Sequence, residues 1–226
     1  MSDFSCVVFD LDGTLVDSSH DITAALNRVL IPRGGTALSA QRVAPLLGEG
    51  VRRLVANALH AAGLPASTTD IDEVAPAYLE SYRANPVVET VLYAGVADML
   101  ETLHKRGVPL GVCTNKSEAI ANQVLAWLGV DRHFDTVVGG DRVPDSKPHP
   151  DHLLAAFRDL DQDPAAGVLV GDSTIDQACA RAAGVAFRAV AWASAEVTGE
   201  RLTSFADLVD LVTDTPERTS TEGQEP

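Results

Sequence analysis

Short apolar runs, separated by helix-like segments, constrain the fold of this chain more than any other feature. The runs lie at residues 5–9, 108–113, 136–138, 167–170 and 185–192. Continuous apolar runs of this length are typical of strands that are buried on both faces of a parallel sheet. The helical patterns between the later runs lie at about residues 95–105, 117–128, 150–160 and 174–183. This alternation predicts an α/β fold with a parallel, Rossmann-like sheet flanked by helices.

The segment from residue 18 to residue 92 has a different pattern. Its helix-periodic stretches lie at residues 21–30, 39–47, 51–62 and 70–83. Gly and Pro separate these stretches, and no strand-like run occurs before residues 87–92. We therefore expect a small all-helical cap domain, residues 18–92, inserted into an α/β core made of residues 1–17 and 93–213. The polar residues 214–226 lack large apolar side chains and are expected to form a disordered tail.

The charge balance excludes several classes of partner. The 226 residues contain 17 Lys and Arg against 32 Asp and Glu, a formal net charge of −15, which argues against binding to nucleic acid or to an anionic membrane. No apolar run approaches the roughly 18 residues of a membrane-spanning helix. The three cysteines lie far apart, which favours reduced thiols and a cytoplasmic location. We expect a small-molecule substrate and a monomer or homodimer.

Two carboxylates, Asp10 and Asp12, directly follow the first apolar run in the sequence D-L-D-G-T-L-V-D. In open α/β sheets, ligands bind beyond the carboxyl ends of the strands. Gly13 would let the backbone approach an anion closely. The alternative is an ordinary Asp/Gly turn in which Thr14 caps the next helix, and this motif alone leaves both interpretations open.

Two further motifs would suit an anion. Thr114 and Asn115 follow the second run just before a helix, which places a hydroxyl and free backbone amides at a sheet edge. Lys147, one of only three lysines, lies in a loop next to prolines and could supply a fixed positive charge. The alternatives are a helix cap for Thr114 and a solvated loop lysine for Lys147.

A second carboxylate pair follows the run at residues 167–170. Asp172 and Asp176 lie in G-D-S-T-I-D, one helical turn apart. Carboxylate oxygens with retained waters are the ligands that Mg²⁺ prefers, so this pair could hold a metal ion. Helix capping by Asp172 or Ser173 is the alternative.

Together, the motifs D-x-D-G-T-L-x-D, T-N, K-P and G-D-S-x-x-D closely resemble the four signature motifs of the haloacid dehalogenase superfamily, most of whose members are phosphatases. The resemblance covers about residues 5–212, and the helical block stands where that superfamily has its first type of cap. It implies that Asp10 is the nucleophile that becomes an aspartyl-phosphate and that Asp12 is the general acid and base. True dehalogenases lack the second carboxylate, so the presence of Asp12 argues against dehalogenation.

The resemblance also implies the remaining site residues. Mg²⁺ would be held by the Asp10 carboxylate, the Asp12 backbone carbonyl, Asp172 and, directly or through water, Asp176. The phosphoryl group would be bound by Gly13, Thr114, the Asn115 backbone and Lys147.

The predicted cap carries a second, narrower resemblance. Its loop L-L-G-E-G-V-R-R, residues 46–53, resembles the L-L-G-x-G loop of bacterial phosphoglycolate phosphatases. The sequence L-Y-A-G-V at residues 92–96 resembles their Y-P-G-V return to the core, with Ala94 in place of the usual Pro. The specificity residues predicted from this loop are Glu49, Gly50, Arg52 and Arg53. Arg52 or Arg53 could bind a substrate carboxylate, or both could simply face solvent.

The expected activity is Mg²⁺-dependent hydrolysis of a small phosphate ester, with 2-phosphoglycolate as the favoured substrate. A phosphatase for another sugar phosphate, a nucleotide or pyrophosphate is the first alternative. A β-phosphoglucomutase-like phosphomutase is the second, and a binding protein without catalytic activity is the third. The segment 18–92 contains no lysine, which argues against the phosphonatases, because these use a cap lysine.

Overall fold

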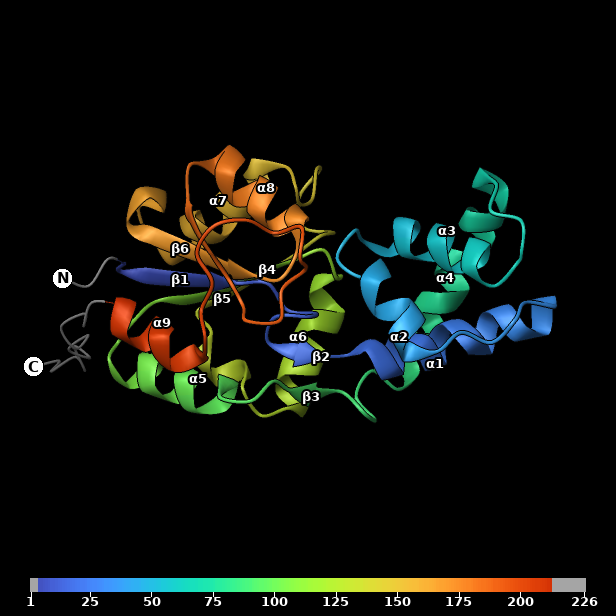
Figure 1. The fold of residues 1–226 in the computed structure, drawn as a ribbon, viewed down its shortest axis with the longest axis horizontal. Coiled ribbons are helices and arrows are strands. Elements are labelled where there is room, and N and C mark those ends of the chain that lie inside the picture. Colours follow the sequence, from blue (N-terminus) through green and yellow to red (C-terminus); the bar gives the residue numbers. More distant parts are fainter. Residues whose placement is uncertain (1–3, 213–226) are drawn as a thin grey trace, which may run out of the picture.

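The strands of the main sheet are all parallel and lie in the order β5-β4-β1-β6-β7 (Figure 1). The computed structural model describes residues 4–212. The strands are β1 Cys6–Phe9, β4 Leu110–Thr114, β5 Thr136–Gly139, β6 Gly167–Gly171 and β7 Ala186–Ala189. The predicted α/β fold is thus confirmed. The run at 185–192 is shorter as a strand than predicted, because the chain turns after Ala189 and Ala193 donates a backbone hydrogen bond to Val190.

Helices cover both faces of this sheet, with α7 and α8 on one side and α5 and α9 on the other (Figure 1). The core helices are α5 Val96–Lys105, α6 Glu118–Trp127, α7 Pro150–Leu160, α8 Thr174–Ala183 and α9 Phe205–Leu211. Side chains of β1 alternate between the faces: Cys6 and Val8 pack with Phe157, whereas Val7 and Phe9 pack in the cluster that contains Leu100. Both sides of the strand are therefore buried, which explains its continuous apolar run.

The cap helices lie beyond the carboxyl end of β1 (Figure 1). They are α1 Ser19–Leu30, α2 Ala40–Val43, α3 Val51–Ala61 and α4 Thr68–Ala84. The predicted helix at 39–47 is shorter, because Pro45 has no backbone N–H, and the chain continues as a 3₁₀ turn, Ala44–Leu46. No helix within residues 4–212 is long and apolar enough to cross a membrane. The inserted cap is confirmed, while its boundaries stay a prediction; the predicted tail at 214–226 lies outside the described residues.

The chain enters and leaves the cap side by side. The short strand β2, Val16–Asp17, pairs antiparallel with β3, Val91–Leu92. Next to this pair, the buried Asp21 carboxylate of α1 accepts hydrogen bonds from the backbone N–H groups of Val88, Glu89 and Thr90 and from the Thr90 hydroxyl. The predicted strand at 87–92 is therefore only two residues long, since the amides before it bind a side chain instead of a neighbouring strand.

Asp21 is expected to stabilise this joint in a pH-dependent way. Burial raises the pKa of Asp21, but the hydrogen bonds from Thr90 and the backbone amides outweigh burial and lower the pKa below its ordinary value. The substitution Asp21→Ala leaves buried amides unpaired and should reduce the free energy of unfolding by about 2 kcal/mol at pH 7, as measured by urea denaturation. Because the folded-state pKa is lowered, this stabilisation is complete above the ordinary Asp pKa of about 4 and is lost as the pH falls through the folded-state pKa.

Asp98→Ala is the matched control. Asp98 is also an acidic residue in the first turn of a helix, α5, but it is exposed. Its substitution should change the free energy of unfolding by no more than about 0.5 kcal/mol. Equal losses in the two variants, or a loss in Asp21→Ala that does not diminish in acid, would contradict the assigned role of Asp21.

Candidate active site

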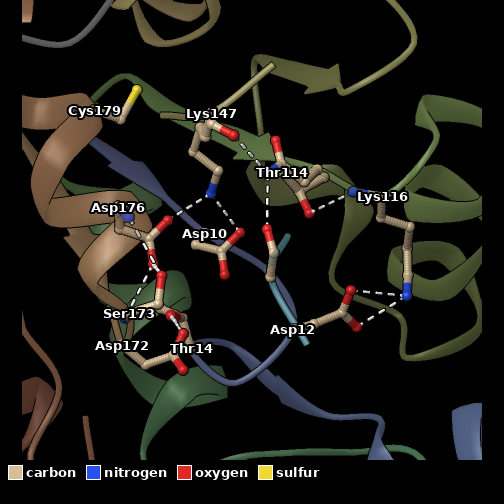
Figure 2. Close-up of polar contacts among 12 residues, drawn as sticks. Asp10, Asp12, Thr14, Thr114, Lys116, Lys147, Asp172, Ser173, Asp176 and Cys179 are labelled. Atoms are coloured by element: carbon tan, nitrogen blue, oxygen red, sulfur yellow. Dashed lines mark hydrogen bonds and ion pairs between the residues drawn. The ribbon is translucent and has the colours of Figure 1, made fainter. Parts of the chain in front are cut away.

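The carboxyl edge of the sheet brings the four sequence motifs together (Figure 2). Asp10 directly follows β1, Thr114 ends β4, and Asp172 directly follows β6. Lys147 reaches the same place from the loop before α7. Since parallel neighbouring strands end at one edge, residues more than 100 positions apart in the sequence become neighbours here.

Lys147 lies next to Asp10 and Asp176 and is buried. Its Nζ atom is 2.7 Å from Asp10 Oδ1 and 2.7 Å from Asp176 Oδ1. Burial lowers the pKa of this ammonium group, but Asp10 and Asp176 outweigh burial and raise the pKa well above its ordinary value. The geometry thus excludes the solvated loop lysine that the sequence left open. The His152 imidazole also supports the loop, because its Nδ1 accepts a hydrogen bond of 3.1 Å from the Lys147 backbone.

Three carboxylates form an acidic cluster. One oxygen each of Asp10, Asp172 and Asp176 lies within 4.8 Å of the others. Burial raises the pKa of Asp10 to about 8, although Lys147 opposes the shift. Burial and then the neighbouring Asp176 raise the pKa of Asp172 to about 7. Hard oxygen donors held close together in a region of low dielectric fit a small divalent cation such as Mg²⁺.

The loop after β1 fits tightly against this cluster. Gly13 has φ of +91°, and a Cβ atom there would lie 2.6 Å from Asp172 Oδ2, so only glycine is tolerated. Thr14 donates a hydrogen bond of 2.9 Å to Asp172 Oδ1 instead of capping a helix. The N-cap of α8 is Ser173, whose backbone and side chain form a capping box with Asp176. Asp172 therefore does not cap the helix, and its carboxylate is part of the acidic cluster.

Asp12 points away from the cluster toward a different cation (Figure 2). Its Oδ1 and Oδ2 atoms are 2.9 and 2.8 Å from Lys116 Nζ, and Oδ1 also accepts a hydrogen bond from Ser18. The Tyr82 hydroxyl of α4 lies 3.2 Å from the same Nζ. No role for Lys116 was predicted from the sequence. The available signal was its position, because this scarce residue type directly follows Thr114 and Asn115.

Asn115 joins the cap loop to the core. Its Nδ2 atom donates to the Gly48 carbonyl at 2.7 Å and to the Lys147 carbonyl at 2.9 Å. Thr114 Oγ1 accepts a bond of 3.2 Å from the Lys116 backbone, so its hydroxyl lies at the start of the turn into α6. The second motif therefore links the cap, the loop of Lys147 and the strand end.

Two hollows adjoin Asp12. The smaller, which we call the inner cavity, has a volume of about 50 Å³ and lies between the core residues Asp10, Asp12 and Lys116 and an apolar cap wall. The wall is formed by Ile22, Leu47, Val51, Leu54, Tyr78, Leu79 and Tyr82. The larger, the outer cleft, has a volume of about 500 Å³ and is lined by acidic and polar residues that include Asp17, Glu49 and Glu196.

The predicted specificity residues do not all reach these hollows. Gly50 lines the inner cavity and Glu49 lines the outer cleft. The side chains of Arg52 and Arg53 are 63% and 68% exposed, and they pair with Asp72 and Glu49 respectively. Neither arginine lines the inner cavity or the outer cleft, so the structure favours the solvent-facing interpretation for both.

Comparisons with known proteins agree with this architecture. The family model of haloacid dehalogenase-like hydrolases matches residues 7–190. A phosphoglycolate phosphatase of Cereibacter sphaeroides is 39% identical over 181 residues, which are 80% of this chain and 82% of the relative. A plasmid-encoded phosphoglycolate phosphatase of Cupriavidus necator is 40% identical over 181 residues, with 80% and 78% covered.

Solved structures give the same fold. A protein from Haemophilus somnus, described as a predicted phosphoglycolate phosphatase, superposes with a TM-score of 0.85 at 26% identity and covers 93% of this chain and 99% of its own. CbbY from Rhodobacter sphaeroides, solved with xylulose-(1,5)bisphosphate, has a TM-score of 0.75 at 25% identity, with 91% and 96% covered.

The contacts of Asn115 generate a testable expectation. Asn115→Ala leaves the Gly48 and Lys147 carbonyls without their donor and should lower the free energy of unfolding by about 2 kcal/mol in urea denaturation. Amide hydrogen exchange in the cap loop should become faster as well.

Ser117→Ala is the matched control, because the nearby Ser117 hydroxyl is buried but makes no hydrogen bond with any described residue. Its removal should change stability by less than about 0.5 kcal/mol. If Ser117→Ala were as destabilising as Asn115→Ala, the two hydrogen bonds would not be the cause.

Proposed function

The chain belongs to the haloacid dehalogenase-like hydrolase family, and on that premise we propose that it is a Mg²⁺-dependent phosphatase that converts 2-phosphoglycolate into glycolate and phosphate. One observation carries the proposal: the buried Lys147 contacts both Asp10 and Asp176 of the acidic cluster, and Asp12, two residues from Asp10, lines the inner cavity. The names of the relatives support the choice of substrate.

Asp10, Asp172 and Asp176 would hold the Mg²⁺ ion together with the Asp12 backbone carbonyl. Their oxygen donors fit such an ion, and their mutual repulsion favours its binding. When bound, the ion neutralises part of the negative charge of the phosphoryl group, so that a carboxylate can approach it.

Asp10 would act as the nucleophile. One carboxylate oxygen forms a bond to phosphorus while the bond to the leaving oxygen breaks, which gives an aspartyl-phosphate. Asp12 would donate a proton to the leaving oxygen and then accept a proton from the water that hydrolyses the aspartyl-phosphate. The position of Asp12 supports this role, since its side chain borders the inner cavity and is held apart from the acidic cluster by Lys116.

Lys147, Thr114 and the backbone of Asn115 would bind the phosphoryl oxygens. The short contact of Lys147 with Asp10 places its positive charge next to the attacking atom. Positioning and charge contribute most of the catalysis in phosphoryl transfer, so rigid donors are favourable here. Burial and the ion pairs provide that rigidity.

The hollows favour a small substrate over a bisphosphate. CbbY was solved with a sugar bisphosphate, whose second phosphate needs several positive or donor groups. Among the described residues that line the inner cavity and the outer cleft, Lys116 is the only Lys or Arg. A single additional negative charge on the substrate fits this arrangement better than a phosphate dianion.

A substrate panel tests the proposal. With Mg²⁺, kcat/KM should be highest for 2-phosphoglycolate when it is compared with a hexose 1-phosphate, a nucleoside monophosphate, pyrophosphate and a xylulose bisphosphate. Asp10→Asn should reduce kcat at least about 10³-fold, because the amide is not a nucleophile. Asp161→Asn, which makes the same change at an exposed residue with positive φ, should retain full activity.

Other results of this experiment would redirect the assignment. A nucleotide, sugar phosphate or pyrophosphate with the highest kcat/KM would replace 2-phosphoglycolate as the substrate. Conversion of the hexose 1-phosphate into a 6-phosphate without release of phosphate would indicate a phosphomutase. Substantial activity in Asp10→Asn would refute the nucleophile.

Metal binding should be visible without turnover. At about 100 times its Kd, Mg²⁺ should add about 2.7 kcal/mol to the free energy of unfolding and raise the Tm in thermal denaturation. In Asp172→Asn the same Mg²⁺ concentration should give a clearly smaller rise, because one charged ligand is lost. Asp161→Asn again serves as the control, and an absence of any Mg²⁺ effect on the wild-type Tm would contradict the metal site.

A further inference from the structure

The reaction described above uses Lys147 but leaves the second buried ammonium group of the site, that of Lys116, without a role toward substrate. We propose that Lys116 binds the carboxylate of the substrate and so selects phosphate esters of small hydroxy acids. This inference rests on the proposed function and names the residue that would recognise the leaving group of the substrate.

The position of Lys116 supports this role. Its side chain is only 7% exposed, and it lines the inner cavity beside Asp10 and Asp12. Burying an ammonium group costs several kcal/mol unless charged or polar partners compensate for it. Asp12 and the Tyr82 hydroxyl are such partners, so the ammonium group is held in the site next to Asp10 and Asp12.

The charges around the inner cavity also favour Lys116 as the partner of a substrate carboxylate. The cap wall carries no charged side chain and is apolar apart from its tyrosine hydroxyls, and Lys116 is the only Lys or Arg among the described residues that line either hollow. A carboxylate that enters beside Asp10 and Asp12 meets repulsion from both, so a compensating cation is required. Arg52 and Arg53, the alternatives from the sequence, pair with other groups at the surface.

The present partners of Lys116 show that its ammonium group can bind a carboxylate. Both oxygens of Asp12 contact its Nζ atom, at 2.9 and 2.8 Å, and the Tyr82 hydroxyl lies at 3.2 Å. A substrate carboxylate has the same chemistry as the Asp12 carboxylate, so it can take over part of this coordination. Lys116 would then hold Asp12 less tightly and leave that carboxylate closer to the leaving oxygen. Recognition of the acid and positioning of Asp12 are thereby linked.

The size of the inner cavity favours a small leaving group. The inner cavity is small, about 50 Å³, which is room for only a few water molecules. The glycolate portion of 2-phosphoglycolate has about that size. The methylene group would face the apolar cap wall while the carboxylate reaches Lys116.

A pair of substrates separates this role from a structural one. Ethyl phosphate is 2-phosphoglycolate with a methyl group in place of the carboxylate. We expect Lys116→Met to lower kcat/KM for 2-phosphoglycolate about 10- to 100-fold more than it lowers kcat/KM for ethyl phosphate, since the loss of the Asp12 contact affects both esters and the loss of carboxylate binding affects only the first. Lys116→Arg, which keeps the charge, should retain part of the preference. Lys105→Met, at an exposed lysine of α5, is the matched control and should change neither value.

A binding measurement tests the role of Lys116 even when the protein shows no turnover. In the Asp10→Asn protein with Mg²⁺, calorimetry should show tighter binding of 2-phosphoglycolate than of ethyl phosphate, and the additional Lys116→Met change should remove the difference. Lys116→Gln replaces Lys116→Met in both assays if the Met variant does not fold, as judged by its Tm.

The outcomes distinguish a failure of the proposed function from a failure of the role of Lys116. If wild-type protein hydrolyses neither ester, the proposed function fails, and the calorimetric comparison still decides the role of Lys116. Equal losses for both esters in Lys116→Met would overturn the inference and leave Lys116 as a residue that only positions Asp12. A preference for 2-phosphoglycolate that survives in Lys116→Met, or one that is absent from the Asp10→Asn protein, would overturn it as well.

Discussion

Two buried ammonium groups determine how the carboxylates of this molecule are arranged. Asp10 and Asp12 are two residues apart in one loop, yet Lys147 contacts the first and Lys116 contacts the second. A buried carboxylate costs several kcal/mol unless a cation or several hydrogen-bond donors compensate for it, and here a different lysine contacts each of the two aspartates. This separation places one carboxylate in the acidic cluster and the other at the inner cavity. Asp10 and Asp12 therefore occupy different electrostatic environments, as the proposed nucleophile and proton donor would require.

The sequence contained enough information to predict the edge of the sheet but not the cap side of the site. Asp10, Thr114 and Asp172 were placed correctly because each directly follows or ends an apolar run, and parallel strands end together. The environment of Lys116 depends on Tyr82, which packs beside it from another helix. No local pattern indicates such a contact, so Lys116 was passed over. The sequence made Arg52 a candidate for binding a substrate carboxylate, and only the folded chain shows that it pairs with Asp72.

The fold differs from what the sequence pattern predicts where tertiary contacts decide the local structure. The helix Phe205–Leu211 is short and carries no strong periodic signal, but it packs against α5, and this tertiary contact compensates for its length. The strand expected at residues 87–92 is mostly replaced by amides that bind Asp21. Propensity and periodicity describe what a segment can form by itself. A buried carboxylate or a neighbouring helix then decides between the possibilities.

The pairing of β2 with β3 has a consequence for how such a chain can vary. Because the cap begins and ends at adjacent strands, the entropy of loop closure is compensated locally by this pair and by the Asp21 contacts. For a flexible segment whose ends are already fixed together, doubling the length adds only about 0.6 kcal/mol. The inserted helices can therefore be lengthened, shortened or exchanged while the sheet and its carboxylates stay in place. The apolar cap wall of the inner cavity can thus change while the carboxylates and the two buried lysines of the core stay in place.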